Sequence, residues 1–316
     1  MSESIRNFNP DAVFAGDLHL HERQEFNKET KSGLNIRLED GLSILDQIGD
    51  LVRDFSLKYV IFTGDVFEQK DRLPNHIIIP FGERIRIICN HGAEVIVIRG
   101  NHDFKFMGYP TLHIFNEIKF MDKICSPLLY ELRTNRHLGC IPYFRNPDEF
   151  KKAWEDIHTN WVTKPDIFIF HGDLPGAYYS DLIKVPGDWV LPTHKTALYI
   201  GGHIHRPQLL VANDTKINFV GVPYQLDFEE TRYTDTKRVF LYNSDENSII
   251  SHTLKYPSFV DYQIDSEMTF IPKNKYIRIL GTVEPQDRLR IKELKENLLS
   301  AGANSVQIKV KYLTEY

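Results

Sequence analysis

Five short apolar segments of this 316-residue chain each end in a cluster of Gly, Asp, Asn or His, and this regularity constrains the fold more than any other feature. Apolar segments that alternate with helical patterns are typical of an α/β layered domain. In such a domain, ligands gather just beyond the carboxyl ends of the strands, so five polar endings in series predict one shared site. The segments with their endings are AVFA-GDLH (12–19), KYVIFT-GD (58–65), AEVIVI-RGNHD (93–103), DIFIF-HGD (166–173) and ALYI-GGHIH (197–205).

The remaining pattern adds helices and further strands to this layered domain. Apolar residues spaced three or four apart predict a helix over 38–55, and a second helix is expected over 77–90. INFV (217–220) is a sixth strand of the same kind. Beyond about residue 229 the pattern becomes more β-like, and three further segments are expected to form antiparallel strands: RVFLYN (238–243), SIISHTL (248–254) and FVDYQI (259–264).

The C-terminal part of the chain reads as a second, smaller unit. Pro257 and the segment 266–274 suggest a boundary, and the strand–helix–strand pattern that follows predicts a βαβ-like unit. We therefore expect a main domain over 1–265 and a small α+β capping domain over 273–316. The second carries nine Lys or Arg against five Asp or Glu, although the whole chain has a formal net charge of −5.

The side chains at the strand ends are of the types that bind divalent metals. Asp, His and Asn together suit Mn²⁺, Fe or Zn²⁺, and three scattered cysteines argue against a thiolate site. Seven donors exceed the needs of one four-coordinate ion and suit two ions that share a carboxylate, the usual clamp for displacement at phosphorus. The candidate ligands are Asp17, His19, Asp65, Asn101, His171, His203 and His205.

The order GDLH, GD, GNHD, a lone strand-end His and GHIH resembles the calcineurin-like metallophosphoesterase superfamily. The resemblance implies a layered β-sandwich flanked by helices and a site that binds two divalent cations. By the same resemblance, Asp65 would bridge the two ions. One ion would be held by Asp17, His19 and His205, and the other by Asn101, His171 and His203.

The same resemblance suggests which residues act on the substrate. His102 would contact the phosphate and aid departure of the leaving group, and Asp103 would orient it. Arg99 matches a phosphate-binding arginine of the phosphoprotein phosphatases. Arg206 and Tyr224 are candidates for substrate contact, with a rim or packing role as the alternative.

The segment GVPYQLDFEE (221–230) is similar to the one that follows the GHIH block in SbcD-like DNA double-strand-break repair nucleases. That branch also carries a small capping domain. The resemblance implies a two-metal exonuclease or endonuclease, most simply with Mn²⁺ (Mg²⁺, Fe or Zn²⁺ being alternatives), that hydrolyses DNA phosphodiester bonds in recombination, repair or replication. The implied partners are DNA and an SbcC-like coiled-coil ABC ATPase, and a homodimer is left open.

Two features depart from this branch. Glu68 stands where many of its members have a His three residues after the bridging Asp. Arg99 favours the alternative of a metallo-phosphomonoesterase or protein phosphatase, but the GDVFEQK block (64–70) lacks the arginine that those phosphatases have there. A binding module without catalysis is a third reading, which the complete set of seven ligands opposes.

The expected location is cytoplasmic, or the host cytoplasm for a compact phage-type member. No apolar stretch reaches the roughly 18 to 20 residues that span a bilayer, so no membrane association is expected. The N-terminus lacks a secretory pattern, and the odd number of cysteines suits a reducing compartment.

Overall fold

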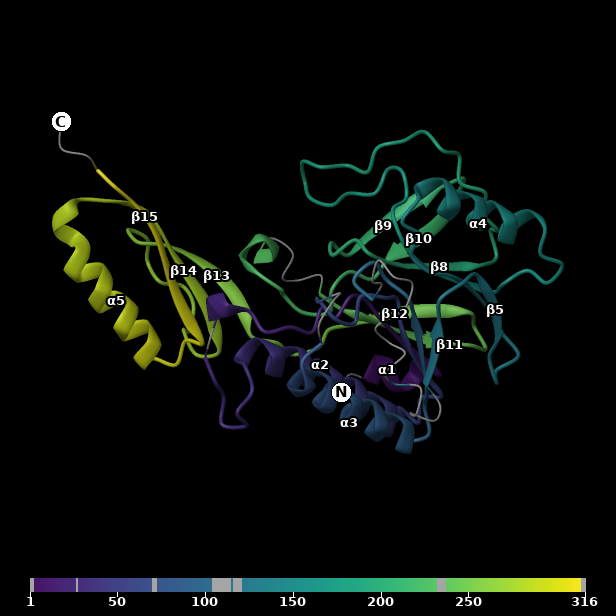
Figure 1. The fold of residues 1–316 in the computed structure, drawn as a ribbon, viewed down its shortest axis with the longest axis horizontal. Helices are drawn as coiled ribbons and strands as arrows, with labels where there is room; N and C mark the ends of the chain where they lie inside the picture. The colour runs from purple at the N-terminus through teal and green to yellow at the C-terminus, as the bar shows by residue number, and fades with distance from the viewer. Residues whose placement is uncertain are drawn as a thin grey trace.

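In a computed structural model that describes residues 3–26, 28–69, 73–103, 115, 121–231 and 237–313, the chain forms two six-stranded sheets and one three-stranded sheet. The large sheets lie together, and the small sheet stands apart with its own helix (Figure 1). This is the expected layered α/β fold. Within the described ranges, no helix is both long enough and apolar enough to cross a membrane.

The first large sheet has the order β12-β11-β1-β2-β3-β4, and its strands β1 to β4 run parallel. β11 pairs antiparallel with both β1 and β12, as the sequence predicted for those two segments. The strands are β1 (Ala12–Ala15), β2 (Tyr59–Phe62), β3 (Glu94–Ile98), β4 (Met121–Ile124), β11 (Val239–Asn243) and β12 (Ser248–His252).

The second large sheet has the order β5-β6-β7-β8-β10-β9, with β6, β7, β8 and β10 parallel. The sequence predicted β7, β8 and β10 and missed β5, β6 and β9. The strands are β5 (Leu128–Glu131), β6 (His137–Ile141), β7 (Ile167–His171), β8 (Leu198–Gly202), β9 (Gln208–Ala212) and β10 (Thr215–Phe219).

Alternation of side chains along the central strands sends one set between the two sheets and the other toward the helices. In β1, Phe14 faces the core between the sheets, whereas Val13 faces the core beneath the helices. A third core lies under the helix that covers the second sheet. The helices are α1 (Glu3–Phe8), α2 (Ile36–Phe55) and α3 (Asn75–Asn90) on the first side, and α4 (Pro147–Thr159) on the second. The predicted helix over 38–55 is confirmed within α2.

The small sheet, in the order β13-β14-β15, corrects one expectation. FVDYQI was expected in an antiparallel arrangement, but β13 (Ser258–Gln263) pairs parallel with β14 (Lys275–Val283). The helix α5 (Arg288–Ser300) then connects β14 to the parallel β15 (Ser305–Tyr312), which confirms the βαβ pattern. Because β13 belongs to this sheet, we propose that the small domain begins near residue 258, and we call residues 258–313 the C-terminal unit.

The C-terminal unit is joined to the main domain through a buried arginine in the first turn of α2. The Arg37 side chain is fully buried, and its guanidinium lies 4.9 Å from the Phe259 ring and 4.8 Å from the Tyr276 ring. It donates to Asp40 at 2.5 Å and to the carbonyl of Gln225 at 2.7 Å. A buried ion pair completed by carbonyls and aromatic faces fixes the orientation of the groups around it.

Arg37→Ala should lower the free energy of unfolding by about 3–5 kcal/mol, because it leaves the carboxylate of Asp40 buried without its cation. Denaturant unfolding would measure this. Arg53→Ala is the matched control on the same helix, since Arg53 is 54% exposed and its loss should cost little. Equal stabilities for the two variants would contradict the proposed role of Arg37.

Candidate metal centre

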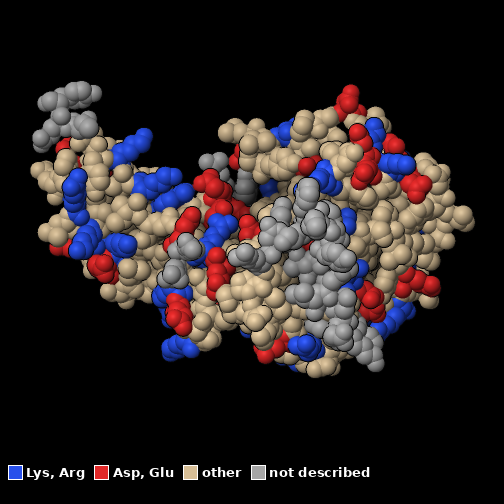
Figure 2. Space-filling view, in the orientation of Figure 1, with Lys and Arg blue, Asp and Glu red and all other residues tan. Residues whose placement is uncertain are grey.

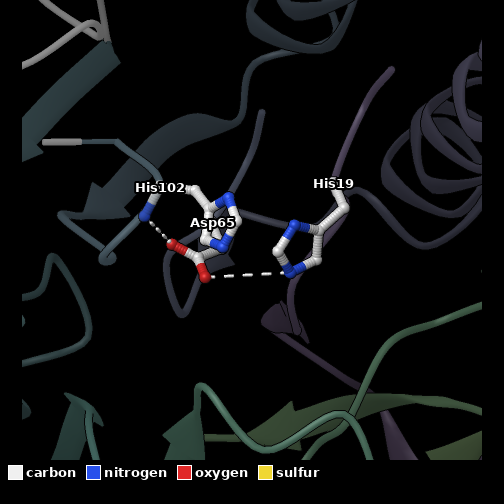
Figure 3. Close-up of side chains that lie close together, drawn as sticks. All are labelled: His19, Asp65 and His102. Carbon is white, nitrogen blue, oxygen red and sulfur yellow. Dashed lines mark hydrogen bonds and ion pairs between the residues drawn. The ribbon is translucent and has the colours of Figure 1, made fainter. Parts of the chain in front are cut away.

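The loops that follow β1 and β2 run side by side and bring their polar endings together. The backbone N–H of His19 donates to the carbonyl of Asp65 at 3.0 Å, and that of Leu20 donates to Val66 at 2.9 Å. The His19 ring and the Asp65 carboxylate then face each other, with Nε2 3.7 Å from Oδ2 (Figure 3). The strand-end rule thus places these two residues as the sequence predicted.

His19 and His205 form the first group of donor atoms. Their Nε2 atoms lie 2.9 Å apart, although the residues come from different sheets. Two imidazole nitrogens directed at one point suit a shared cation. Asp17, expected beside them, accepts the backbone N–H of His203 at 3.1 Å and lies 3.4 Å from Nδ1 of His171. The assignment of Asp17 to the first ion therefore stays a prediction.

Asn101, His171 and His203 form the second group. The amide oxygen of Asn101 lies 2.9 Å from Nε2 of His171 and 2.7 Å from Nδ1 of His203. Oδ2 of Asp65 lies 3.4 Å from Nε2 of His171, so the same carboxylate oxygen faces both groups. Asp65 is thus the carboxylate that lies between the two groups, and its role as a bridging ligand stays a prediction.

Each of these four imidazoles turns one nitrogen inward and has an oxygen acceptor beside the other. Such acceptors orient metal-binding histidines and select their tautomers. The outer pairs are His19 Nδ1 with Glu68 Oε2 at 2.7 Å, His171 Nδ1 with the Thr63 carbonyl at 2.7 Å, His203 Nε2 with Asp173 Oδ1 at 3.4 Å, and His205 Nδ1 with Glu230 Oε1 at 3.4 Å. The Glu68 contact is a close ionic approach without the alignment of a hydrogen bond. This donor set fits two divalent cations.

The charges at the site support one another. Burial alone would raise the pKa of Asp65, but the adjacent His171 and His19 hold it well below its usual range. The contact with His19 lowers the pKa of Glu68 to about 2. Burial opposes protonation of His171, and Asp65 and Asp17 nevertheless raise its pKa to about 9. A cation that binds His171 would have to displace that proton, because a histidine ligand must be neutral.

Three of the predicted ligands have a left-handed backbone, which is rare for residues other than glycine. The φ angles are 45° at His19, 49° at Asp65 and 83° at His203. Such strain persists where surrounding contacts impose it, and it concentrates at functional sites. Gly100, which precedes Asn101, lets the loop after β3 pack closely against Asp65. A Cβ at Gly100 would overlap the side chain and the backbone N of Asp65.

His102 lies at this site, but Asp103 does not orient its ring. The backbone N–H of His102 donates to Asp65 Oδ1 at 2.7 Å (Figure 3). The ring Nδ1 of His102 lies 2.7 Å from the carbonyl oxygen of Glu68. The Asp103 carboxylate instead accepts the backbone N–H groups of Asp65 and Gly100 at 2.8 and 3.0 Å. The expected role of Asp103 is therefore wrong. Its buried carboxylate holds the loops after β2 and β3 together.

The three candidate substrate contacts differ in position. Tyr224 is fully buried and its hydroxyl donates to the carbonyl of Leu18 at 2.8 Å, so a substrate contact is ruled out and the packing alternative holds. Arg99 donates to the carbonyl of Tyr143 at 2.7 Å. The guanidinium of Arg206 forms an ion pair with Asp181, with Nη1 2.9 Å from Oδ1. It also lines a cleft of about 540 Å³, which we call the metal cleft, together with Tyr179, Ser180, Leu182, His203, His205, Asp227, Glu229 and Glu230.

The sequence did not predict a role for three carboxylates at this site. Glu68 was noted only because many SbcD-like nucleases have a His at that position. Asp173 and the carboxylate of Glu230 had no expected role. Asp173 lies two residues beyond His171 in the same strand ending, which was an available signal. Glu230 is buried, and its Oε2 lies 2.7 Å from the ammonium nitrogen of the fully buried Lys237. Nothing in the local pattern around Lys237 marks it as buried.

Comparison with known proteins agrees with this geometry. The family model described as calcineurin-like phosphoesterase matches residues 11–207, which contain all seven candidate ligands. The chain is also 24% identical over 234 residues to a protein of Bacillus subtilis (strain 168) that is named as a subunit of the nuclease SbcCD. The alignment covers 62% of this chain, and the chain spans 59% of the length of that relative.

Asp65→Asn should reduce the metal content from two ions toward one, because it removes the charge that faces both donor groups. Elemental analysis after equilibrium dialysis against Mn²⁺ would measure the stoichiometry. Asp50→Asn, which changes an exposed carboxylate on α2, should leave the stoichiometry unchanged. Two tightly held ions in Asp65→Asn would overturn the bridging assignment.

Glu230→Gln should weaken metal binding about 10- to 100-fold, because the outer nitrogen of His205 loses its carboxylate. Titration calorimetry with Mn²⁺ would test this. The neighbouring Glu229→Gln is the matched control, since Glu229 is 82% exposed. If both variants bind Mn²⁺ as the unmodified protein does, Glu230 has no role in orienting His205.

Proposed function

The chain belongs to the calcineurin-like phosphoesterase family, and on that premise we propose that it is a metal-dependent nuclease that hydrolyses DNA phosphodiester bonds. The observation that carries the proposal is the pair of donor groups that face Asp65, each of which contributes one histidine, His205 or His203, to the wall of the metal cleft. When bound, two divalent cations there would supply Lewis acidity at the phosphoryl group and lower the pKa of a water molecule. We propose Mn²⁺ as the physiological ion.

The protein's own residues would position the phosphoester and assist departure of the leaving group. The carbonyl beside Nδ1 of His102 can only accept a hydrogen bond, so Nδ1 carries a proton. Nε2 is then left for the substrate, and in the imidazolium form it can donate a proton to the departing oxygen. The Asp65 carboxylate holds His102 by accepting the backbone N–H of His102, and it does not contact the His102 ring through this hydrogen bond.

Several features favour DNA over a phosphomonoester. The one feature that favoured a phosphatase was Arg99, and its guanidinium donates to the backbone of Tyr143. The relative from B. subtilis is named as part of a nuclease. The C-terminal unit carries many Lys and Arg side chains on the face shown in Figure 2, which suits a polyanion longer than one phosphate.

We extend the proposal to partners by similarity alone. Because the relative is named as one subunit of a nuclease, we propose that this chain also works with a second protein, an SbcC-like coiled-coil ATPase, and acts in recombination, repair or replication. The site geometry does not depend on that partner, so cleavage can be tested with this chain by itself.

The test is a cleavage assay on end-labelled single- and double-stranded DNA with Mn²⁺, with Mg²⁺ and with a chelator, alongside p-nitrophenyl phosphate. We expect DNA cleavage that requires the divalent metal. Hydrolysis of the monoester without cleavage of either DNA would overturn the proposal in favour of a phosphatase.

His102→Ala should lower kcat for DNA by about 10²- to 10⁴-fold, because it removes the proposed proton donor to the leaving oxygen. Its metal stoichiometry should stay at the value of the unmodified protein, since the other donors are intact. His91→Ala, at an exposed position after α3, is the matched control. Undiminished cleavage by His102→Ala would exclude the proposed role.

A further inference from the structure

A second cavity, of about 450 Å³, lies beside the metal cleft and shares Tyr179 with it. It forms where the chain after β6 meets the loop between β7 and β8. We call it the aromatic cavity. Its side chains relevant to binding are Tyr143, Phe144, Arg145, Lys151, Tyr179 and Trp189.

The aromatic cavity adjoins the second group of donor atoms. The Tyr143 ring lies 5.9 Å from the His203 ring and 6.2 Å from the His171 ring, measured between centroids. The Tyr179 ring lies 6.4 Å from that of His203. If a phosphate bound at these histidines, a group attached to that phosphate could therefore reach into the aromatic cavity.

The chemistry of the walls suits a flat, polar aromatic group. Trp189, half-buried against Trp154, and the exposed Tyr179 offer ring faces on which a base can stack. Lys151 places its ammonium 5.8 Å from the Trp189 ring, which adds a cation for a neighbouring phosphate. Carboxylates of Asp148, Asp173 and Asp188 also line the cavity and can accept an N–H group of a base, such as N3–H of thymine.

We propose that the aromatic cavity binds the unstacked nucleobase next to the scissile phosphate. This inference rests on the proposed function and narrows its substrate to a strand whose bases are free to leave the stack. Unstacking costs least in single-stranded DNA, so single strands and frayed ends are the substrates that this cavity favours. Duplex DNA with closed ends is cut more slowly, because a base pair must open first.

The experiment compares two single-stranded oligomers of equal length with Mn²⁺, one of dT nucleotides and one with stable abasic units in place of every base. We expect kcat/KM to be at least about tenfold higher for dT, because stacking of the base contributes to binding. Trp189→Ala should bring the ratio of the two values toward one. Trp161→Ala, a half-buried tryptophan outside the cavity, should keep the ratio of the unmodified protein.

A second pair of variants guards against a folding defect in Trp189→Ala. Tyr179→Ala should lower the dT-to-abasic ratio, and Tyr179→Phe, which keeps the ring, should restore it. Binding of a 2-aminopurine oligomer in chelator gives a readout independent of cleavage, since stacking on the cavity rings quenches its fluorescence.

The outcomes separate this inference from the proposed function. Equal cleavage of the dT and abasic oligomers by the unmodified protein overturns the base-binding cavity and leaves the nuclease in place. An equal loss of cleavage on both oligomers in Trp189→Ala and Tyr179→Ala also overturns it, because the rings would then support the site rather than bind a base. Failure to cleave any DNA overturns the proposed function itself.

Discussion

The candidate site depends on the stacking of two separate sheets at their carboxyl ends. His171 ends β7 in the second sheet, yet its Nδ1 bonds the carbonyl of Thr63, just beyond β2 in the first sheet. Gly64 makes room for this, since a Cβ there would overlap the His171 ring. If the sheets slid by one residue, the ring would lose both Thr63 and Asp65. Packing between the sheets therefore sets the distances among the donor atoms.

The central strands could be predicted because each is an apolar run that is buried on both faces. AVFA, for example, is wholly buried and became β1 as expected. β9 was missed because two of its apolar residues, Leu209 and Val211, are exposed to solvent. The alternation of polar and apolar residues that marks a half-buried strand is therefore absent from its sequence. The parallel pairing of β13 could not be predicted either. Its partner β14 lies beyond a connection of eleven residues without a helix, which is an unusual crossover for parallel strands.

The seven candidate ligands could be proposed from strand endings, because that rule depends only on the direction of the strands. Roles that depend on tertiary packing could not. Tyr224 stands in a segment rich in polar residues, yet Arg37 packs against its ring and removes it from solvent. Asp103 follows His102 directly, but its carboxylate accepts the backbone N–H groups of Asp65 and Gly100 instead of contacting the His102 ring. In both cases the position in the sequence did not indicate which groups the side chain would contact.

The C-terminal unit and the candidate metal centre share one hydrogen-bond network, which explains why the segment 225–230 matters to both. The side chain of Gln225 accepts the backbone N–H of Phe259 in β13 at 2.8 Å and donates to the carbonyl of Glu230 at 3.0 Å. Glu230 in turn faces the outer nitrogen of His205. Any tilt of the C-terminal unit must therefore break the bond to Gln225 or carry Glu230 with it. A displacement of Phe259 would therefore reach Glu230, the partner of His205, through two hydrogen bonds.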